Sequence, residues 1–173
     1  LTSELLFPLD VAERSNYAAT GICPWSGTLL QGTVHDDNCR FLGGVCGHAG
    51  LFGTSKAVMM LTRELLQLMK GRHSILPISP ETFFNFCKRI GNSEWTPGFN
   101  LPSQYGSSSG RYFSKSSIGH LGFTGTSFWI DPENEVIVVL LSNRVVKAHS
   151  QLGIKKLRRD MHDIVMKGLG VAS

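Results

Sequence analysis

The residues best suited to chemistry lie in one short stretch, GHLGFTGT at residues 119–126. Its glycines leave room for a ligand to lie against the backbone, and exposed backbone N–H groups there can bind a peptide-like substrate by strand addition or stabilise an oxyanion. His120 adds an imidazole that titrates close to neutral pH. A plain edge strand with a lone histidine would contain the same residues, and the spacing alone favours that simpler interpretation.

A second candidate is GSSSG at residues 106–110, which has the form of a Gly-x-Ser-x-Gly nucleophile elbow centred on Ser108. An elbow needs a buried strand directly before the serine and a helix directly after it. Here SQY precedes the motif and RYFSKSS follows it. We therefore expect a flexible loop and no nucleophile at this position.

Metal-binding side chains crowd one segment of the chain: His35, Asp36, Asp37, Cys39, Cys46 and His48. Zinc accepts such donors, but structural sites usually show tightly paired spacing, and catalytic sites often place two ligands on one helix face. Neither pattern is present. We expect hydrogen-bonded polar side chains that hold a glycine-rich loop, and a zinc protein is only the third alternative.

The composition is that of an ordinary globular protein of one-domain length, 173 residues with 42 % hydrophobic and 17 % charged residues. The net charge is +4, and much of the excess lies in KKLRR at residues 155–159. No aromatic residues interleave with this run, so we interpret it as the solvated face of a helix and expect no nucleic-acid partner. The longest aliphatic run, Val136 to Leu141, is far shorter than the ~20 residues of a membrane span.

The four cysteines are too few and too unevenly spaced for a disulfide framework, so free thiols are expected. Free thiols, together with a first stretch that does not resemble a signal peptide, slightly favour the cytoplasm. The chain begins with leucine, which favours a fragment or a processed product.

Two helices are predicted in the middle of the chain. One begins after Thr54 or Ser55 and extends to about Lys70, with apolar residues at helical spacing. The other has Ser79 as N-cap, Pro80 at its first position and Gly91 just past its end. Its predicted inward side chains are Phe83, Phe84, Cys87 and Ile90.

The segments around these helices have different patterns. Residues 1–40 are interrupted by proline and glycine and are expected to form long loops with short extended pieces, and residues 42–54 a tight glycine-rich loop. Residues 95–115 suit an irregular connection, with a short strand at 95–101.

A β-hairpin of residues 123–130 and 136–142 follows, joined by DPENE. Because residues 136–141 lack polar alternation, we expect a central strand covered on both faces. Residues 151–167 predict a last helix with one apolar stripe, opposite its basic residues, made of Ile154, Leu157, Met161, Ile164 and Val165.

The triplet His120-Leu121-Gly122 and the following FTGTSFWIDPENEVIVVLLSNR resemble the third motif of the serine β-lactamase and penicillin-binding-protein superfamily, in the His-x-Gly form of class C-like hydrolases and esterases. Upstream, VHDDNCRFLGGVCGHAGLFGTSKAVMMLTREL resembles a segment that runs from a buried loop into a helix of the same subfamily. The similarity extends through PGFNLPS, GSSSGRYF and the last helix, in the same order and spacing. It covers nearly the whole chain from about Trp25.

Members of that superfamily use a Ser-x-x-Lys nucleophile and a Tyr-x-Asn or Ser-x-Asn motif, and neither occurs in these 173 residues. The resemblance places Leu1 just downstream of both motifs. We therefore expect the C-terminal part of a serine hydrolase without its nucleophile.

The resemblance also implies roles for the triplet. The N–H of Phe123 would be one oxyanion donor, next to Gly122, and the absent serine would supply the other. His120 stands where penicillin-recognising relatives carry lysine, and would support the proton network or the substrate carboxylate. Because histidine is only partly cationic at neutral pH, an ester or peptide substrate is favoured over a β-lactam.

Further residues are expected around this motif. The predicted substrate-binding residues are Leu121, Thr124, Gly125 and Thr126. The predicted cleft wall consists of His35, Asp36 and His48.

The expected fold class is α+β, the C-terminal portion of the β-lactamase/transpeptidase-like fold, as a single partial domain over residues 1–173. It would consist of a loop-rich segment (1–54), a helical region (55–91), and a sheet hairpin with the C-terminal helix (92–173). The expected function is hydrolysis of an ester, amide or peptide-type acyl substrate through an acyl-serine intermediate, with no cofactor and no metal. The alternative is a non-catalytic peptide or cell-wall binding module. Expected partners are the acyl substrate and either the missing N-terminal part or a second copy of the chain, because truncation leaves an unpaired strand edge.

Overall fold

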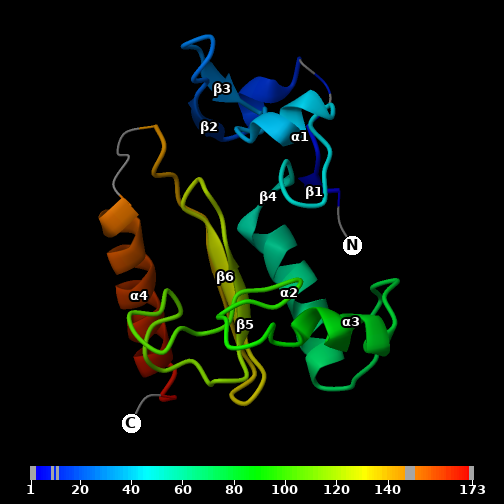
Figure 1. Ribbon diagram of the computed structural model, residues 1–173, viewed down its shortest axis with the longest axis vertical. Helices are drawn as coiled ribbons and strands as arrows, with labels where there is room; N and C mark the ends of the chain where they lie inside the picture. Colours follow the sequence, from blue (N-terminus) through cyan, green and yellow to red (C-terminus); the bar gives the residue numbers. More distant parts are fainter. Residues whose placement is uncertain (1–2, 9, 11, 147–150, 172–173) are drawn as a thin grey trace.

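The computed structural model describes residues 3–8, 10, 12–146 and 151–171. Figure 1 shows its helices and strands. In chain order the elements are β1 Leu5–Leu6, the 3-10 helix η1 Arg14–Asn16, β2 Ala19–Ile22, β3 Leu29–Gln31, α1 Asp37–Phe41, β4 Phe52–Gly53, α2 Ser55–Met69, α3 Pro80–Cys87, β5 Ile118–Leu121, β6 Ser127–Asp131, β7 Val136–Leu140 and α4 Gln151–Gly168.

Three antiparallel strands, in the order β5-β6-β7, form the central sheet. Helix α2 runs along one side of the sheet and α4 along the other, and the loop-rich segment with α1 lies beyond the upper end of the strands in Figure 1. The α+β class is therefore confirmed. Among the described residues, no helix is long and apolar enough to span a membrane.

Alternation along β6 places its side chains in two separate cores, because successive residues of a strand point to opposite faces. Ile130 packs with Leu65 of α2 and Phe83 of α3, whereas its neighbour Trp129 packs with Met166 of α4. Both β6 side chains are almost fully buried. The sheet is thus packed on both faces, against α2 and α3 on one and against α4 on the other.

The starts of the middle helices are confirmed. Thr54 caps α2 by accepting a hydrogen bond from the N–H of Ala57, and Ser79 caps α3 in the same way at Thr82. Helix α3 ends at Cys87, however, because the backbone of Lys88 is extended.

The early end of α3 changes which of its side chains are buried. Phe83 is buried and Cys87 half-buried, as predicted, but Phe84 and Ile90 are exposed, so their predicted inward positions are wrong. Residues 95–101 form no strand, but only the isolated bridges of Trp95 with Asn100 and of Asn100 with Gly119.

Two features of the hairpin differ from the prediction. Its first strand begins at Ser127, since residues 122–126 form the tight turn that joins β5 to β6. Strand β7 lies at the edge of the sheet, and β6 is the central strand. Among the described residues β7 has no partner on its outer side, although α2 and α4 both contact it, so coverage of both faces was predicted correctly.

The predicted apolar stripe of α4 is wrong in part. Leu157 and Ile164 are exposed, whereas Arg158 and His162 are buried beside Ile154 on the side facing the sheet. These two polar residues lie one helical turn apart, so they share a face with apolar neighbours. The basic run is therefore not entirely a solvated surface.

The loop-rich segment matches the prediction of short extended pieces. It contains the two-stranded pairs β1-β4 and β2-β3. GSSSG forms an irregular loop, and all four cysteines are free, as expected.

Candidate active site

The turn of residues 122–126 carries two of the predicted catalytic residues, Gly122 and Phe123, and directly follows strand β5, which carries the third, His120. The N–H of Gly122 donates to the carbonyl of Thr126 at 2.8 Å, and the N–H of Gly125 donates to the carbonyl of Gly122 at 3.1 Å. Gly125 has a φ of +116°, which a residue with a side chain rarely adopts. The turn is therefore closed by its own backbone.

Arg158 of α4 holds both ends of this turn. Its Nη2 donates to the carbonyls of Gly122 at 2.8 Å and Thr126 at 2.7 Å. Burial, and secondly the charge of Arg144, lower the pKa of the Arg158 guanidinium. The last helix is thereby tied to the loop that follows the His-x-Gly triplet.

Arg144 holds the middle of the turn. Its Nε donates to the carbonyl of Phe123 at 2.7 Å, and its backbone N–H donates to the carbonyl of Thr124 at 2.8 Å. The hydroxyl of Ser142 donates to the carbonyl of Gly125 at 2.8 Å. All carbonyls of the turn are thus engaged, whereas the N–H groups of Phe123 and Thr124 donate to no acceptor among the described residues.

These N–H groups belong to residues that line a cavity of about 610 Å³. The predicted site residues on its walls are His120, Leu121, Gly122, Phe123, Thr124 and Thr126, together with the predicted cleft-wall residues His35, Asp36 and His48. Gly125, the remaining predicted residue, is buried within the turn and does not line this cavity. Tertiary structure therefore gathers two segments separated by about 70 residues in sequence around one space.

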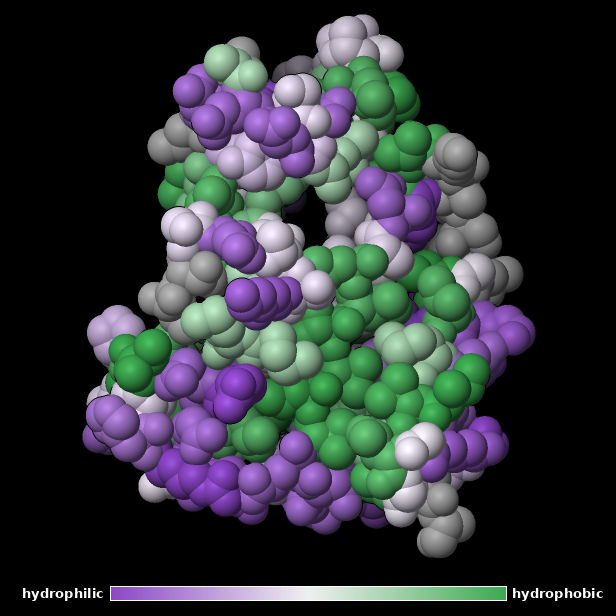
Figure 2. Space-filling view, turned by 180° about the vertical axis from the view of Figure 1, so that it is seen from behind, coloured by the Kyte–Doolittle hydropathy of each residue, from purple (hydrophilic) through white to green (hydrophobic). Residues whose placement is uncertain are grey.

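A second, more apolar cavity of about 520 Å³ shares His120, Gly122, Thr124 and Thr126 with the first. Its other walls come from α2, the end of β7 and the loop-rich segment. Figure 2 shows the molecule hollowed between the loop-rich segment, in its upper part, and the body below.

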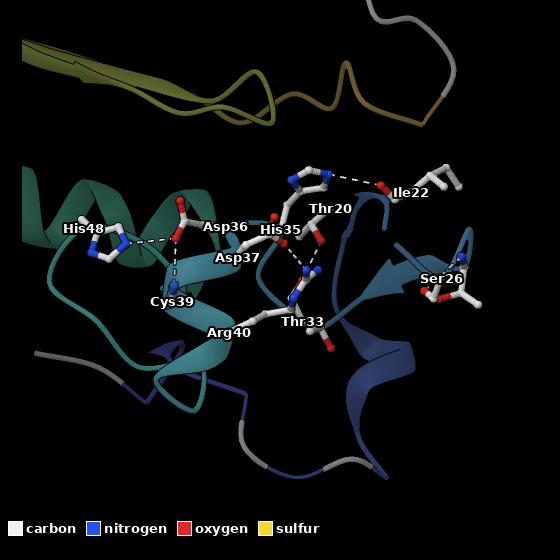
Figure 3. A network of polar contacts seen from close by, with 11 residues as sticks. Thr20, Ile22, Ser26, Thr33, His35, Asp36, Asp37, Cys39, Arg40 and His48 are labelled. Atoms are coloured by element: carbon white, nitrogen blue, oxygen red, sulfur yellow. Dashed lines mark hydrogen bonds and ion pairs between the residues drawn. The ribbon is translucent and has the colours of Figure 1, made fainter. Parts of the chain in front are cut away.

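The cleft-wall side chains form part of a polar network (Figure 3). Oδ1 of Asp36 accepts from the N–H of Cys39 at 2.8 Å, which caps α1, and lies 3.0 Å from Nε2 of His48. These two contacts lower the pKa of the Asp36 carboxyl. The ring of His35 lies 4.9 Å from that of Phe123, so the two walls touch.

His120 lies on β5, directly opposite Phe128 of β6. Its side chain is exposed, yet the protein around it removes enough water to lower the pKa of the imidazole. The neutral form is therefore favoured at pH 7.

No three His, Cys, Asp or Glu side chains of the described residues are close enough to hold a metal ion. Two of the side chains that a zinc site would need form hydrogen bonds to protein groups instead. Asp36 caps α1 and binds His48, and Sγ of Cys39 donates to the carbonyl of Ala49.

Sequence reasoning missed Arg144 and Arg158 as parts of the site. Arg158 was interpreted as solvated because it belongs to KKLRR. Its spacing of four residues from both Ile154 and His162 was a usable signal, since such residues share one helix face. Arg144 lies beyond β7, and nothing local to it indicated its contact with the turn.

A model of the Beta-lactamase family matches residues 2–161. The chain belongs to the β-lactamase family. The predicted resemblance and the β-lactamase-like fold are therefore confirmed.

Relatives in sequence agree with this family. The chain is 32 % identical over 129 residues to a protein of Salmonella agona, and 33 % identical over 129 residues to one of Salmonella gallinarum, both provisionally named D-alanyl-D-alanine carboxypeptidase. Each match covers 66 % of this chain and 27 % of the relative, so the chain spans about a quarter of the length of these relatives.

A crystal structure of a β-lactamase from Mycobacterium bovis resembles the chain in fold, with a TM-score of 0.55 and 18 % identity. The match covers 75 % of this chain and 53 % of the other. At this identity the likeness concerns the fold alone.

Proposed function

We propose that this β-lactamase-family chain forms one part of a serine hydrolase that cleaves an ester, amide or peptide-type acyl substrate through an acyl-serine intermediate. The nucleophile would lie outside residues 1–173, since these contain no Ser-x-x-Lys. The observation that carries the proposal is the N–H of Phe123, which donates to no acceptor among the described residues and belongs to a residue that lines a cavity directly after the His-x-Gly triplet.

In this reaction the serine oxygen attacks the acyl carbonyl carbon while its proton passes to a base that would also lie outside residues 1–173, and the electron pair of the C=O bond moves to the oxygen. When that pair returns, the alcohol or amine leaves with a proton and the acyl-serine remains. The N–H of Phe123 is suited to receive that oxyanion, because it donates to no acceptor among the described residues. Removing one such donor typically lowers turnover by about 10²- to 10³-fold. A chain that lacks the serine altogether should show essentially no hydrolysis.

The environment of His120 bears on the substrate. Because loss of water lowers the pKa of its imidazole, His120 is mostly neutral at pH 7, and is suited to accept a proton but less suited to hold a substrate carboxylate as a cation. Uncharged ester or peptide groups at this position are therefore favoured over β-lactams. The provisional names of the Salmonella relatives make a peptide ending in D-alanyl-D-alanine the carboxylate-bearing substrate to assay beside an uncharged ester.

The test is intact mass after treatment with a fluorophosphonate, which labels activated serines. We expect the 173-residue chain to keep its mass, and a longer product of the same reading frame that includes Ser-x-x-Lys to gain one adduct. A stoichiometric adduct on the chain itself would overturn the assignment of the nucleophile. A longer product that lacks Ser-x-x-Lys and stays unlabelled would favour the alternative, a non-catalytic peptide or cell-wall binding module.

A further inference from the structure

Two consecutive peptide units of the turn have the same unusual arrangement. In each, the carbonyl accepts a hydrogen bond from an arginine guanidinium: Gly122 from Arg158 and Phe123 from Arg144. The N–H groups of the same two units, those of Phe123 and Thr124, donate to no described residue. Because C=O and N–H point in opposite directions across a trans peptide, each arginine lies behind a free donor.

A guanidinium on the carbonyl strengthens the donor at the other end of the peptide unit. Hydrogen bonds to charged groups are about twice as strong as neutral ones, and bonds in a chain polarise one another. The carbonyl oxygen draws electron density from the peptide, which leaves the N–H more positive. Two such donors on consecutive residues of one cavity wall favour an oxygen anion in that cavity.

Arg158 holds the turn by hydrogen bonds, but its buried charge has no counter-ion among the described residues. Its residue is 5 % exposed, it forms no ion pair with the described residues, and its Nε has no hydrogen-bond partner there. A buried charge without a counter-ion is costly, and an apolar side chain of similar volume is often as stable or more so. The positive charge at this position is therefore better explained by an anion that binds on the N–H side of the turn.

Arg144 acts on the second of these peptide units. Its guanidinium carbon lies 4.8 Å from the centre of the Phe123 ring, so the same group contacts both the carbonyl and the side chain of Phe123. The charge of Arg144 also disfavours the charge of Arg158, an effect that an anion bound at the turn would offset.

We propose that Arg158, assisted by Arg144, is a positioning residue that orients and polarises the N–H groups of Phe123 and Thr124 as a two-donor site for an oxygen anion. The inference rests on the proposed function for its biological use, where the anion is the oxyanion of the acyl-transfer step or the carboxylate of the product. The anion-binding property itself belongs to the turn and is measurable without any reaction.

The first experiment records amide resonances of the ¹⁵N-labelled 173-residue chain while sodium acetate replaces sodium chloride at constant ionic strength. We expect saturable downfield shifts of the Phe123 and Thr124 amide protons, loss of the Phe123 response in Arg158→Met, and partial retention in Arg158→Lys. Arg159→Met is the matched control, since it removes one positive charge from the adjacent, more exposed position, and its response should equal that of the wild type. Equal responses in Arg158→Met and Arg159→Met would overturn the inference.

A second variant covers the case in which Arg158→Met does not fold. Arg144→Gln acts at the partly exposed arginine, and should shift the Thr124 amide upfield and weaken its acetate response. An unchanged Thr124 resonance in folded Arg144→Gln, together with an unchanged Phe123 resonance in Arg158→Lys, would also overturn the inference.

The longer product that carries the serine separates this inference from the proposed function. There we expect Arg158→Met to lower kcat roughly tenfold with little change in KM, less than the 10²- to 10³-fold typical for loss of a whole donor. If that product hydrolyses substrates but kcat in Arg158→Met equals that in Arg159→Met, the inference fails and the function stands. If it forms no acyl-enzyme while acetate still shifts the two amides, the function fails and the anion site stands.

Discussion

The lack of a side chain at Gly119 allows the strand that carries His120 to lie against the core. The N–H of Gly119 donates to the carbonyl of Asn100 at 3.0 Å, and the carbonyl of Gly119 accepts from the N–H of Asn100 at 2.8 Å. A Cβ at this position would lie 2.5 Å from the carbonyl oxygen of Phe128 and 2.5 Å from the Trp129 ring. Trp129 is almost fully buried, so it has no room to give way.

Gly119→Ala is therefore expected to reduce the free energy of unfolding by at least about 1–3 kcal/mol, the usual cost of overpacking a core. Urea unfolding followed by circular dichroism measures this. Gly168→Ala is the control, because a Cβ there meets nothing within 4 Å and alanine favours a helix. Equal stability of the two variants would contradict the packing described for β5.

At the scale of single elements, α4 presents a polar as well as an apolar inner face. His162 is fully buried, with Nδ1 2.7 Å from the carbonyl of Ser108 and its ring edge-on to Phe113. Burial is the main cause that lowers the pKa of the His162 imidazole from 6.5, while Arg158 lowers it further and the Ser108 carbonyl and Asp163 raise it. The folded protein thus holds His162 neutral.

This arrangement makes stability depend on pH. Below pH 6.5 the unfolded chain binds a proton at His162 more readily than the folded chain does, so the free energy of unfolding falls as pH decreases. The stability that depends on a neutral His162 is complete above pH 6.5. We expect urea midpoints to fall between pH 7.5 and 5, and to fall less in His162→Gln than in the wild type.

His73→Gln is the matched control, since His73 is exposed. Its pH dependence should equal that of the wild type. A His162→Gln variant with the full wild-type decrease between the two pH values would show that His162 does not cause it.

At the scale of the whole molecule, the edge of β7 and the surface beside it have apolar character. Among the described residues β7 has no partner strand on its outer side. Leu141 after β7, and Leu157 and Ile164 on α4, are exposed. Figure 2 shows a broad apolar area on the body of the molecule below the hollow. Unpaired edges and large apolar patches commonly mark places where chains associate.

We expect the chain to associate with itself, or with the nucleophile-bearing part of the proposed hydrolase. Sedimentation of the 173-residue chain should show a mass that increases with concentration. The double variant Leu157→Glu and Ile164→Glu should shift the distribution towards monomer, whereas Ile75→Glu, an equally exposed isoleucine between α2 and α3, should not. A monodisperse monomer at all concentrations would contradict the expectation.

The sequence by itself determined the features that depend on neighbouring residues. The N-caps Thr54 and Ser79 were predictable because a capping side chain bonds to the backbone three residues away. The family was recognisable because the His120 triplet and the segment before α2 keep their order and spacing along the chain. The starts of these helices and the family can therefore be inferred from the order of residues along the chain alone.

Only the tertiary structure decided which strand is central, where α3 ends and which side chains surround the turn at Phe123. Edge and centre depend on which strands are present to pair, and β7 has the same apolar sequence in either position. Arg144 and Arg158 reach the turn from 21 and 36 residues away along the chain. Their hydrogen bonds require the packing of α4 and β7 together. No periodicity in the sequence could therefore show that the carbonyls of the turn are engaged while the N–H groups of Phe123 and Thr124 have no acceptor among the described residues.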